Sequence, residues 1–210
     1  MTYPPQPADP AMSAPKTRPG TVTFAVWLQI LLAVFLIAQA VLGLLYGADA
    51  EAAVEAELES QGYAMSDLPE GTTFETGGAL AFAPIVVALL LIVLALLNGT
   101  GNRAARVITW VVQPLVLICG GFIAVSQLLL ATFIEAGIES GGGPEGLDAG
   151  ALVDALYGAY PAWTVIVDYG VLALATIGSI LVIILLATPR ANAFFRKEEP
   201  QAYIPGAPPA

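Results

Sequence analysis

Five polar side chains interrupt long apolar runs of this sequence, and one of them is a carboxylic acid. They are Gln29, Gln39, Gln113, Gln127 and Asp168. A polar side chain is costly inside a membrane and usually faces other helices or water. A carboxyl group there can hold a proton or a cation, or it can accept a hydrogen bond from an amide and fix the pairing of two helices. These residues are the candidates for chemistry in this chain.

The distances of these residues from the ends of their apolar runs predict two polar layers. At about 1.5 Å per residue, Asp168, Gln127 and Gln39 lie roughly 9 to 12 Å below the same side of the membrane. We expect these three to form one layer, in which Asp168 and Gln127 share a structural hydrogen bond. The alternatives for Asp168 are a proton or cation site and a contact to a partner. Gln29 and Gln113 fall at matching depths nearer the other side and predict a second layer.

The helical positions of the small residues indicate where these layers point. Gln113 and Gly120 are seven residues apart and share a helix face, and Asp168, Ala175 and Ser179 share another. Small residues mark faces where membrane helices approach closely. We therefore expect Asp168 to face other helices rather than lipid.

Residue types for catalysis or metal binding are scarce. Histidine is absent, which removes the commonest general base and metal ligand. The single cysteine, Cys119, lies in an apolar run and is expected to be a small buried hydrophobe. Residues 99–103, Gly-Thr-Gly-Asn-Arg, lack the Lys-Ser/Thr ending of a phosphate loop, and we interpret them as a connection between helices. We expect no enzymatic activity, no metal site and no cofactor.

The apolar runs themselves predict an all-α integral membrane protein with four transmembrane helices in a bundle. The chain is 57% hydrophobic and 11% charged, whereas soluble domains are about 45–50% apolar and about 25% charged. The excess lies in four blocks, each long enough to cross a bilayer. We place the spans at about residues 21–46, 78–97, 107–134 and 162–187, so that the bundle covers residues 21–187.

The charges predict how the bundle is oriented. All seven basic residues fall in the two tails and the second connection, whereas the first and third connections contain thirteen of the 17 acids and no base. Because cytoplasmic segments retain Lys and Arg, both termini should be cytoplasmic in a plasma membrane. The acidic segments should be extracytoplasmic loops with short helices near residues 48–60 and 148–157. Nucleic-acid binding, which needs a basic face, is not expected.

The two ends of the chain are rich in proline and alanine. Residues 1–20 predict a disordered cytoplasmic tail, and residues 188–210 predict a second cytoplasmic tail. Ala48-Asp49-Ala50 has the pattern of a signal-peptidase site. The apolar run before it is longer than the usual 7–15 residues of a signal peptide, so we expect the first span to be retained, with cleavage near Ala50 as the alternative.

Three functional classes remain. The favoured one is a non-enzymatic accessory, scaffold or envelope-associated protein whose partners are the lipid bilayer and a membrane protein or a second copy of the chain. The alternative is a small channel or transporter subunit that uses Asp168, and an enzyme is the weakest reading. The layout resembles claudins and tetraspanins in outline, but the outer loops lack their cysteines. The composition is similar to that of small membrane proteins of high-GC actinobacteria, which implies a bacterial plasma membrane.

Overall fold

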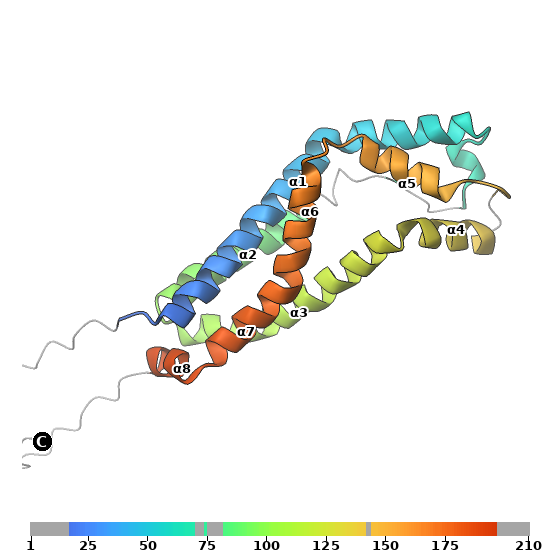
Figure 1. Ribbon diagram of the computed structural model, residues 1–210. Helices are drawn as coiled ribbons and strands as arrows, with labels where there is room; N and C mark the ends of the chain where they lie inside the picture. The colour runs from blue at the N-terminus through green and yellow to red at the C-terminus, as the bar shows by residue number, and fades with distance from the viewer. Residues whose placement is uncertain (1–16, 70–73, 75–81, 142–143, 197–210) are drawn as a thin grey trace, which may run out of the picture.

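Most of the part of the chain that the structure describes is helical, and this part contains no strand. The computed structural model (Figure 1) describes residues 17–69, 74, 82–141 and 144–196. Four of its helices are long and apolar enough to span a membrane, which confirms the predicted fold class at that level. Only 17–28% of the most apolar 18-residue window of each is buried inside the chain. Most side chains of these helices therefore face outward, as expected for helices surrounded by lipid.

Helix α1 (Gly20–Ser60) combines the predicted first span and the predicted surface helix at residues 48–60 into one helix of 41 residues. In Figure 1 it bends beyond its apolar part, and Ala48-Asp49-Ala50 lies within it. It ends where Gly62 adopts a φ of 87° and Tyr63 N–H donates to the Leu58 carbonyl. This is the glycine-terminated helix end that a left-handed residue permits.

Helix α2 (Phe82–Gly99) is the described part of the predicted second span, whose residues 78–81 lie outside the described chain. It extends past the predicted end of the span at residue 97 and includes Asn98. Gly101, with a φ of 80°, turns the chain into α3 (Arg103–Leu128). The Asn102 side chain accepts hydrogen bonds from Ala104 N–H and Ala105 N–H and so caps α3.

The predicted third span, residues 107–134, is not one helix. Helix α3 ends at Leu128, a turn residue follows, and α4 (Leu130–Gly141) continues in a different direction (Figure 1). The break has no proline or glycine. Its physical reason is packing, because Leu130 and Ile134 lie against a separate hydrophobic cluster outside the apolar spans. Cys119 is exposed rather than buried, since it lies on the outward face of α3.

The predicted fourth span is helical but has a π-helical segment at its centre. Helix α6 (Thr164–Ala173) leads through η3 (Leu174–Gly178) into α7 (Ser179–Ala187). The chain changes direction at η3 in Figure 1, as π turns commonly cause. After Thr188 the short helix α8 (Pro189–Phe195) turns back, and Ala191 and Phe195 are buried against α1 and α7. Part of the predicted tail is thus folded.

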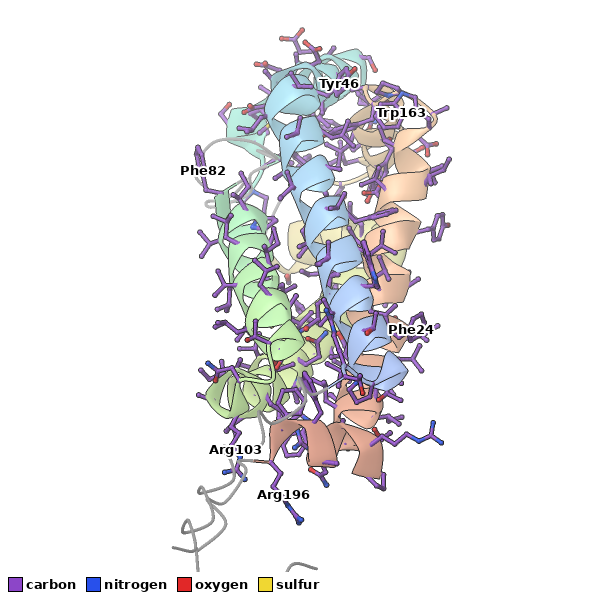
Figure 2. The ribbon with its side chains drawn as sticks, turned by 90° about the vertical axis from the view of Figure 1, so that its left-hand side faces the viewer. Phe24, Tyr46, Phe82, Arg103, Trp163 and Arg196 are labelled. Carbon is purple, nitrogen blue, oxygen red and sulfur yellow. The ribbon has the colours of Figure 1, made fainter. Side chains whose placement is uncertain are left out.

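Three hydrophobic clusters hold these helices together. The central cluster joins α1, α2 and η3 and contains Leu32, Ala33, Ala88, Leu91 and Ala175. A second cluster lies at the end that carries Arg18, Arg103, Arg106, Arg190 and Arg196, which we call the basic end. The third lies at the opposite end, between the last part of α1, α4 and α5 (Ala149–Gly158). We call residues 48–69, 130–141 and 144–160 the acidic cap. Figure 2 shows Arg103 and Arg196 at one end, and Tyr46 and Trp163 at the other.

Candidate functional site

The intramembrane acid lies between α1 and α6. Gln39 Nε2 donates a hydrogen bond of 3.3 Å to Asp168 Oδ1, and both side chains are half-buried. Two residues further along α6, Gly170 lies directly against the Phe35 ring, so that a Cβ at this position would overlap the ring. The absence of a side chain at Gly170 lets α1 and α6 come close enough for the Gln39–Asp168 pair.

The structure brings together two of the three residues expected in this layer. Asp168 is hydrogen-bonded to Gln39, and the bond to Gln127 that the sequence suggested stays a prediction. Gln127 lies in the last turn of α3, and its side chain is outside the described part of the structure.

The second layer contains more residues than the two expected. Gln29 and Gln113 are 0% and 1% exposed, but each is bonded to other residues. Asn98 Nδ2 donates to Gln29 Oε1 at 3.3 Å and to Thr109 Oγ1 at 2.8 Å. Gln113 Nε2 donates to Ser179 Oγ at 2.9 Å. Because Thr109 and Gln113 are four residues apart on α3, the two sets lie next to each other, and we refer to them together as the polar network of α1, α2, α3 and α7.

This network is only partly satisfied. Gln29 Nε2, Asn98 Oδ1 and Gln113 Oε1 are buried and have no hydrogen-bond partner within the described protein. A buried polar atom without a partner costs about 1–3 kcal/mol. The network therefore contains one buried donor, the amide nitrogen of Gln29, and two buried acceptors, the amide oxygens of Asn98 and Gln113, that could each form a further hydrogen bond. Sequence reasoning missed Asn98, Thr109 and Ser179 as members, although Thr109 lies one helical turn before Gln113.

An apolar section separates the two polar layers. Asp168 and Ser179 are eleven residues apart, which is roughly 16 Å along a helix. Between them Gly120 packs on Ala175, so closely that a Cβ on Gly120 would lie 2.6 Å from the Ala175 Cβ. The hydroxyl group of Thr176 in this section donates to its own helix, at the Leu172 carbonyl. The described residues therefore form no continuous polar route along the helices.

The acidic cap has a core of its own. Ala50, Val54 and Leu58 of α1 are each 0% exposed and pack with Leu152 and Leu156 of α5. Hydrogen bonds from side chains also join two segments of the cap, residues 48–69 and 144–160. Gln61 Oε1 accepts from Asp148 N–H at 2.8 Å, and Tyr63 Oη donates to the Glu145 carbonyl at 2.9 Å.

The acids lie on the outside of this core. Glu51, Glu55 and Glu59 each follow a buried residue of α1 and are exposed. Asp148 accepts from Ala151 N–H and caps α5. Among the described residues, no group of three or more acidic, cysteine or histidine side chains is arranged to hold a metal ion.

At the basic end, one arginine holds α8 against α3. Arg106 Nη2 donates to Asn192 Oδ1 at 2.6 Å. Its guanidinium carbon also lies 4.6 Å from the Trp110 ring centroid and 5.1 Å from that of Phe195. Cation–π contacts of this kind contribute about 0.5–2 kcal/mol. Arg106 is thus a structural residue.

No protein-family model matches this chain, and neither a curated protein nor a solved structure matches it.

Proposed function

We propose that this chain is a four-span plasma-membrane protein, with both termini cytoplasmic, that acts by binding another envelope or membrane protein through its acidic cap. The proposal depends on one observation, which is the hydrophobic core of the cap. The segments between the spans are folded against each other through Val54, Leu58 and Leu152 instead of being separate loops. A folded cap presents a fixed surface, and a fixed surface loses less entropy on binding than a mobile loop.

The charge of the cap indicates the class of partner. Its exposed acids include the stripe Glu51, Glu55 and Glu59, and the connections that form the cap contain no Lys or Arg. A surface of one sign steers and selects a partner of the opposite sign. The expected partner is a membrane or envelope protein with a basic extracytoplasmic face, and the chain would be its accessory subunit or scaffold.

Purification from the native membrane tests this proposal. The full-length tagged chain in mild detergent should retain one partner at a stoichiometric amount. The variant Glu51→Gln/Glu55→Gln/Glu59→Gln should lose it, because the α1 stripe is neutralised without any change in buried residues. Asp154→Asn with Glu135→Gln is the control, since both acids are exposed and lie on α5 and α4 rather than on α1. Retention of the partner by the triple variant, or the same loss in the control, would contradict recognition by the stripe.

A small channel or transporter subunit remains the second candidate, favoured by the Gln39–Asp168 pair. The π segment between the two layers also supports it, since π turns are frequent at functional sites. The apolar packing of Gly120 on Ala175 would then have to open during transport. Asp168→Asn keeps the size of the side chain and removes its charge. If proton and cation flux in proteoliposomes is the same for this variant and the unchanged protein, the second candidate fails.

A further inference from the structure

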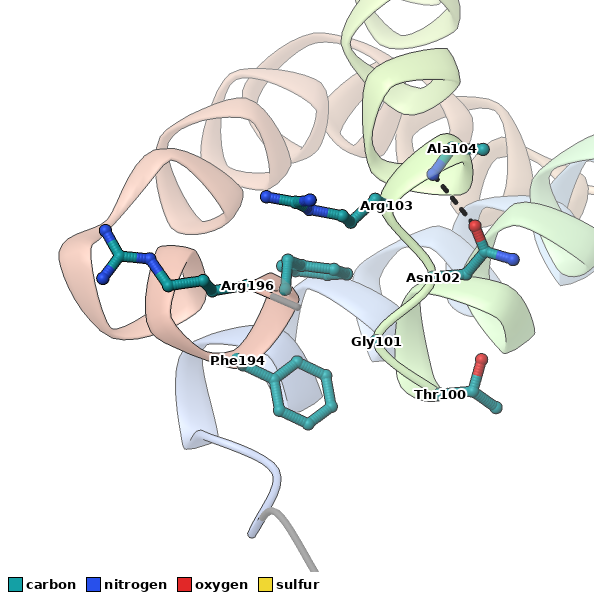
Figure 3. A pocket seen from close by; sticks show the side chains of 8 residues that line it. Thr100, Gly101, Asn102, Arg103, Ala104, Phe194 and Arg196 are labelled. Carbon is teal, nitrogen blue, oxygen red and sulfur yellow. Dashed lines mark hydrogen bonds between the residues drawn. The ribbon is translucent and has the colours of Figure 1, made fainter. Parts of the chain in front are cut away.

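A hollow of ≈ 370 Å³ lies at the basic end, between residues 100–104 and residues 194–196 (Figure 3). The sequence suggested only a helix connection at residues 99–103. The structure adds the second wall, because α8 folds back and brings Phe194, Phe195 and Arg196 beside that turn. Ligand sites usually measure about 300–1,000 Å³. The hollow therefore has room for a headgroup but not for a whole lipid.

Phe194 and Phe195, which form the aromatic floor of this hollow, are held in place by packing. Phe195 is 2% exposed and belongs to the hydrophobic cluster of the basic end. A Cβ on Gly101 would lie 3.2 Å from the Phe194 ring, so the turn and α8 are in close contact. Asn102 is engaged in capping α3. The hollow is therefore a built feature of the fold, with an aromatic floor and a fixed turn at its side.

Positive charge surrounds the hollow. The Arg103 and Arg196 side chains line it and are exposed, and both extend to the left in Figure 3. The Arg18 guanidinium lies beside the same turn, 3.2 Å from a Cβ built on Gly99. Within the described residues of this end, 17–20, 98–108 and 188–196, there is no acid, and the acids nearest to them in sequence, Glu198 and Glu199, lie outside the described residues. Arg103 and Arg106 are three residues apart on α3, and like charges at that spacing repel each other. An anion in the hollow would relieve this repulsion.

The surface next to the hollow is apolar. Val107, Ile108 and Val111 follow Arg103 on α3 and are 58%, 47% and 61% exposed. They belong to a candidate membrane span. A molecule with its charge in the hollow and hydrocarbon along α3 would satisfy both surfaces, whereas a soluble anion would use only the first.

We propose that this hollow binds the phosphate headgroup of an anionic phospholipid, with the acyl chains lying along α3. The guanidinium groups of Arg103 and Arg196 would donate hydrogen bonds to the phosphate oxygens, a geometry to which the arginine fork is suited. Basic groups at the cytoplasmic surface also attract anionic lipids over a longer range. This lipid site goes beyond the proposed partner binding and does not depend on it.

Native mass spectrometry of the delipidated full-length protein tests the site. The protein is mixed with phosphatidylglycerol and phosphatidylcholine in equal amounts, and the bound lipids are counted. We expect phosphatidylglycerol to be retained preferentially. Arg103→Gln and Arg196→Gln should each reduce this preference by about tenfold, because each removes a charged hydrogen bond. Arg190→Gln is the matched control, since Arg190 is exposed on α8 but does not line the hollow.

Several results would overturn the proposal. Equal retention of the two lipids would exclude a headgroup site. The same loss in Arg190→Gln as in Arg103→Gln would mean that general surface charge, not the hollow, attracts the lipid. If inorganic phosphate in excess displaces phosphatidylglycerol, the hollow binds a soluble anion instead. Arg103→Lys keeps the positive charge but loses the planar guanidinium group. If its preference for phosphatidylglycerol lies between that of the unchanged protein and that of Arg103→Gln, direct contact of Arg103 with the phosphate is supported.

Discussion

At the scale of single residues, Asn98 is the centre of the buried polar network. Its amide nitrogen donates to side chains from two other helices, Gln29 of α1 and Thr109 of α3. A hydrogen bond between membrane helices contributes about 0.6–2 kcal/mol. A buried amide that loses its partner adds the cost of an unsatisfied group. Asn98 should therefore determine how α1, α2 and α3 pair more than any apolar residue near it.

We predict that Asn98→Leu lowers the stability of the protein by about 1–3 kcal/mol, because both polar atoms of the Gln29 amide are then without a partner. Gln29→Leu in the same background should recover part of this loss, since two apolar side chains replace a broken polar pair. Thermal unfolding of the four proteins in detergent gives a double-mutant cycle. Strictly additive effects would mean that the two side chains do not interact.

The sequence indicated that Gln29 and Gln113 face other helices, and both are buried, but it did not indicate their hydrogen-bond partners. Which residue bonds which depends on how each helix is rotated about its axis. Sequence alone does not determine that rotation, so the hydrogen bond between Gln39 and Asp168 was not predicted. Asn98 was missed because its position near Gly99 suggested a turn.

At the scale of elements, α3 and the π segment η3 are in close contact in the apolar section. Gly120 has no side chain, and Ala175 occupies the space that a Cβ on Gly120 would need. The two backbones can approach because both residues are small. This contact closes the section between the two polar layers.

We predict that Gly120→Ala destabilises the protein by about 1–3 kcal/mol through overpacking against Ala175. The adjacent Gly121 provides the control, because a Cβ there would meet nothing within 4 Å. Gly121→Ala should be neutral, or stabilising by up to about 1 kcal/mol from helix propensity. Thermal unfolding of both variants measures the difference. Ala175→Gly should rescue Gly120→Ala if the contact is the cause, and failure of that rescue would refute this explanation.

The four apolar runs could be located from hydropathy alone, whereas their interruptions could not. The turn at Leu129 follows from packing of Leu130 and Ile134 on the cap cluster, a contact between segments distant in sequence. The π segment has no breaker residue apart from Gly178 at its end. Helix α8 was read as tail because its proline and alanine content resembles that of the following residues. Its burial depends on Phe195 reaching the core of the basic end.

At the scale of the whole molecule, the two ends of the helices differ in charge and in structure. One end is an acidic cap with its own core, and the other has five described arginines around α8 and a hollow. The positive-inside rule counts Lys and Arg near the ends of spans. By that rule we expect the basic end in the cytoplasm and the cap outside. The partner surface and the lipid site would then be on opposite sides of the bilayer.

We predict this orientation for single cysteines in a Cys119→Ala background. Glu55→Cys, in the exposed stripe of the cap, should react with a membrane-impermeant maleimide in intact cells. Arg190→Cys, exposed at the basic end, should react only after the membrane is permeabilised. Both positions are exposed, so a difference in labelling reports the side of the membrane rather than burial. Val107→Cys, on an outward apolar face, should react slowly in both conditions, since hydrocarbon excludes the reagent. Labelling of Arg190→Cys in intact cells would reverse the orientation, and it would place the acidic stripe out of reach of any extracytoplasmic partner.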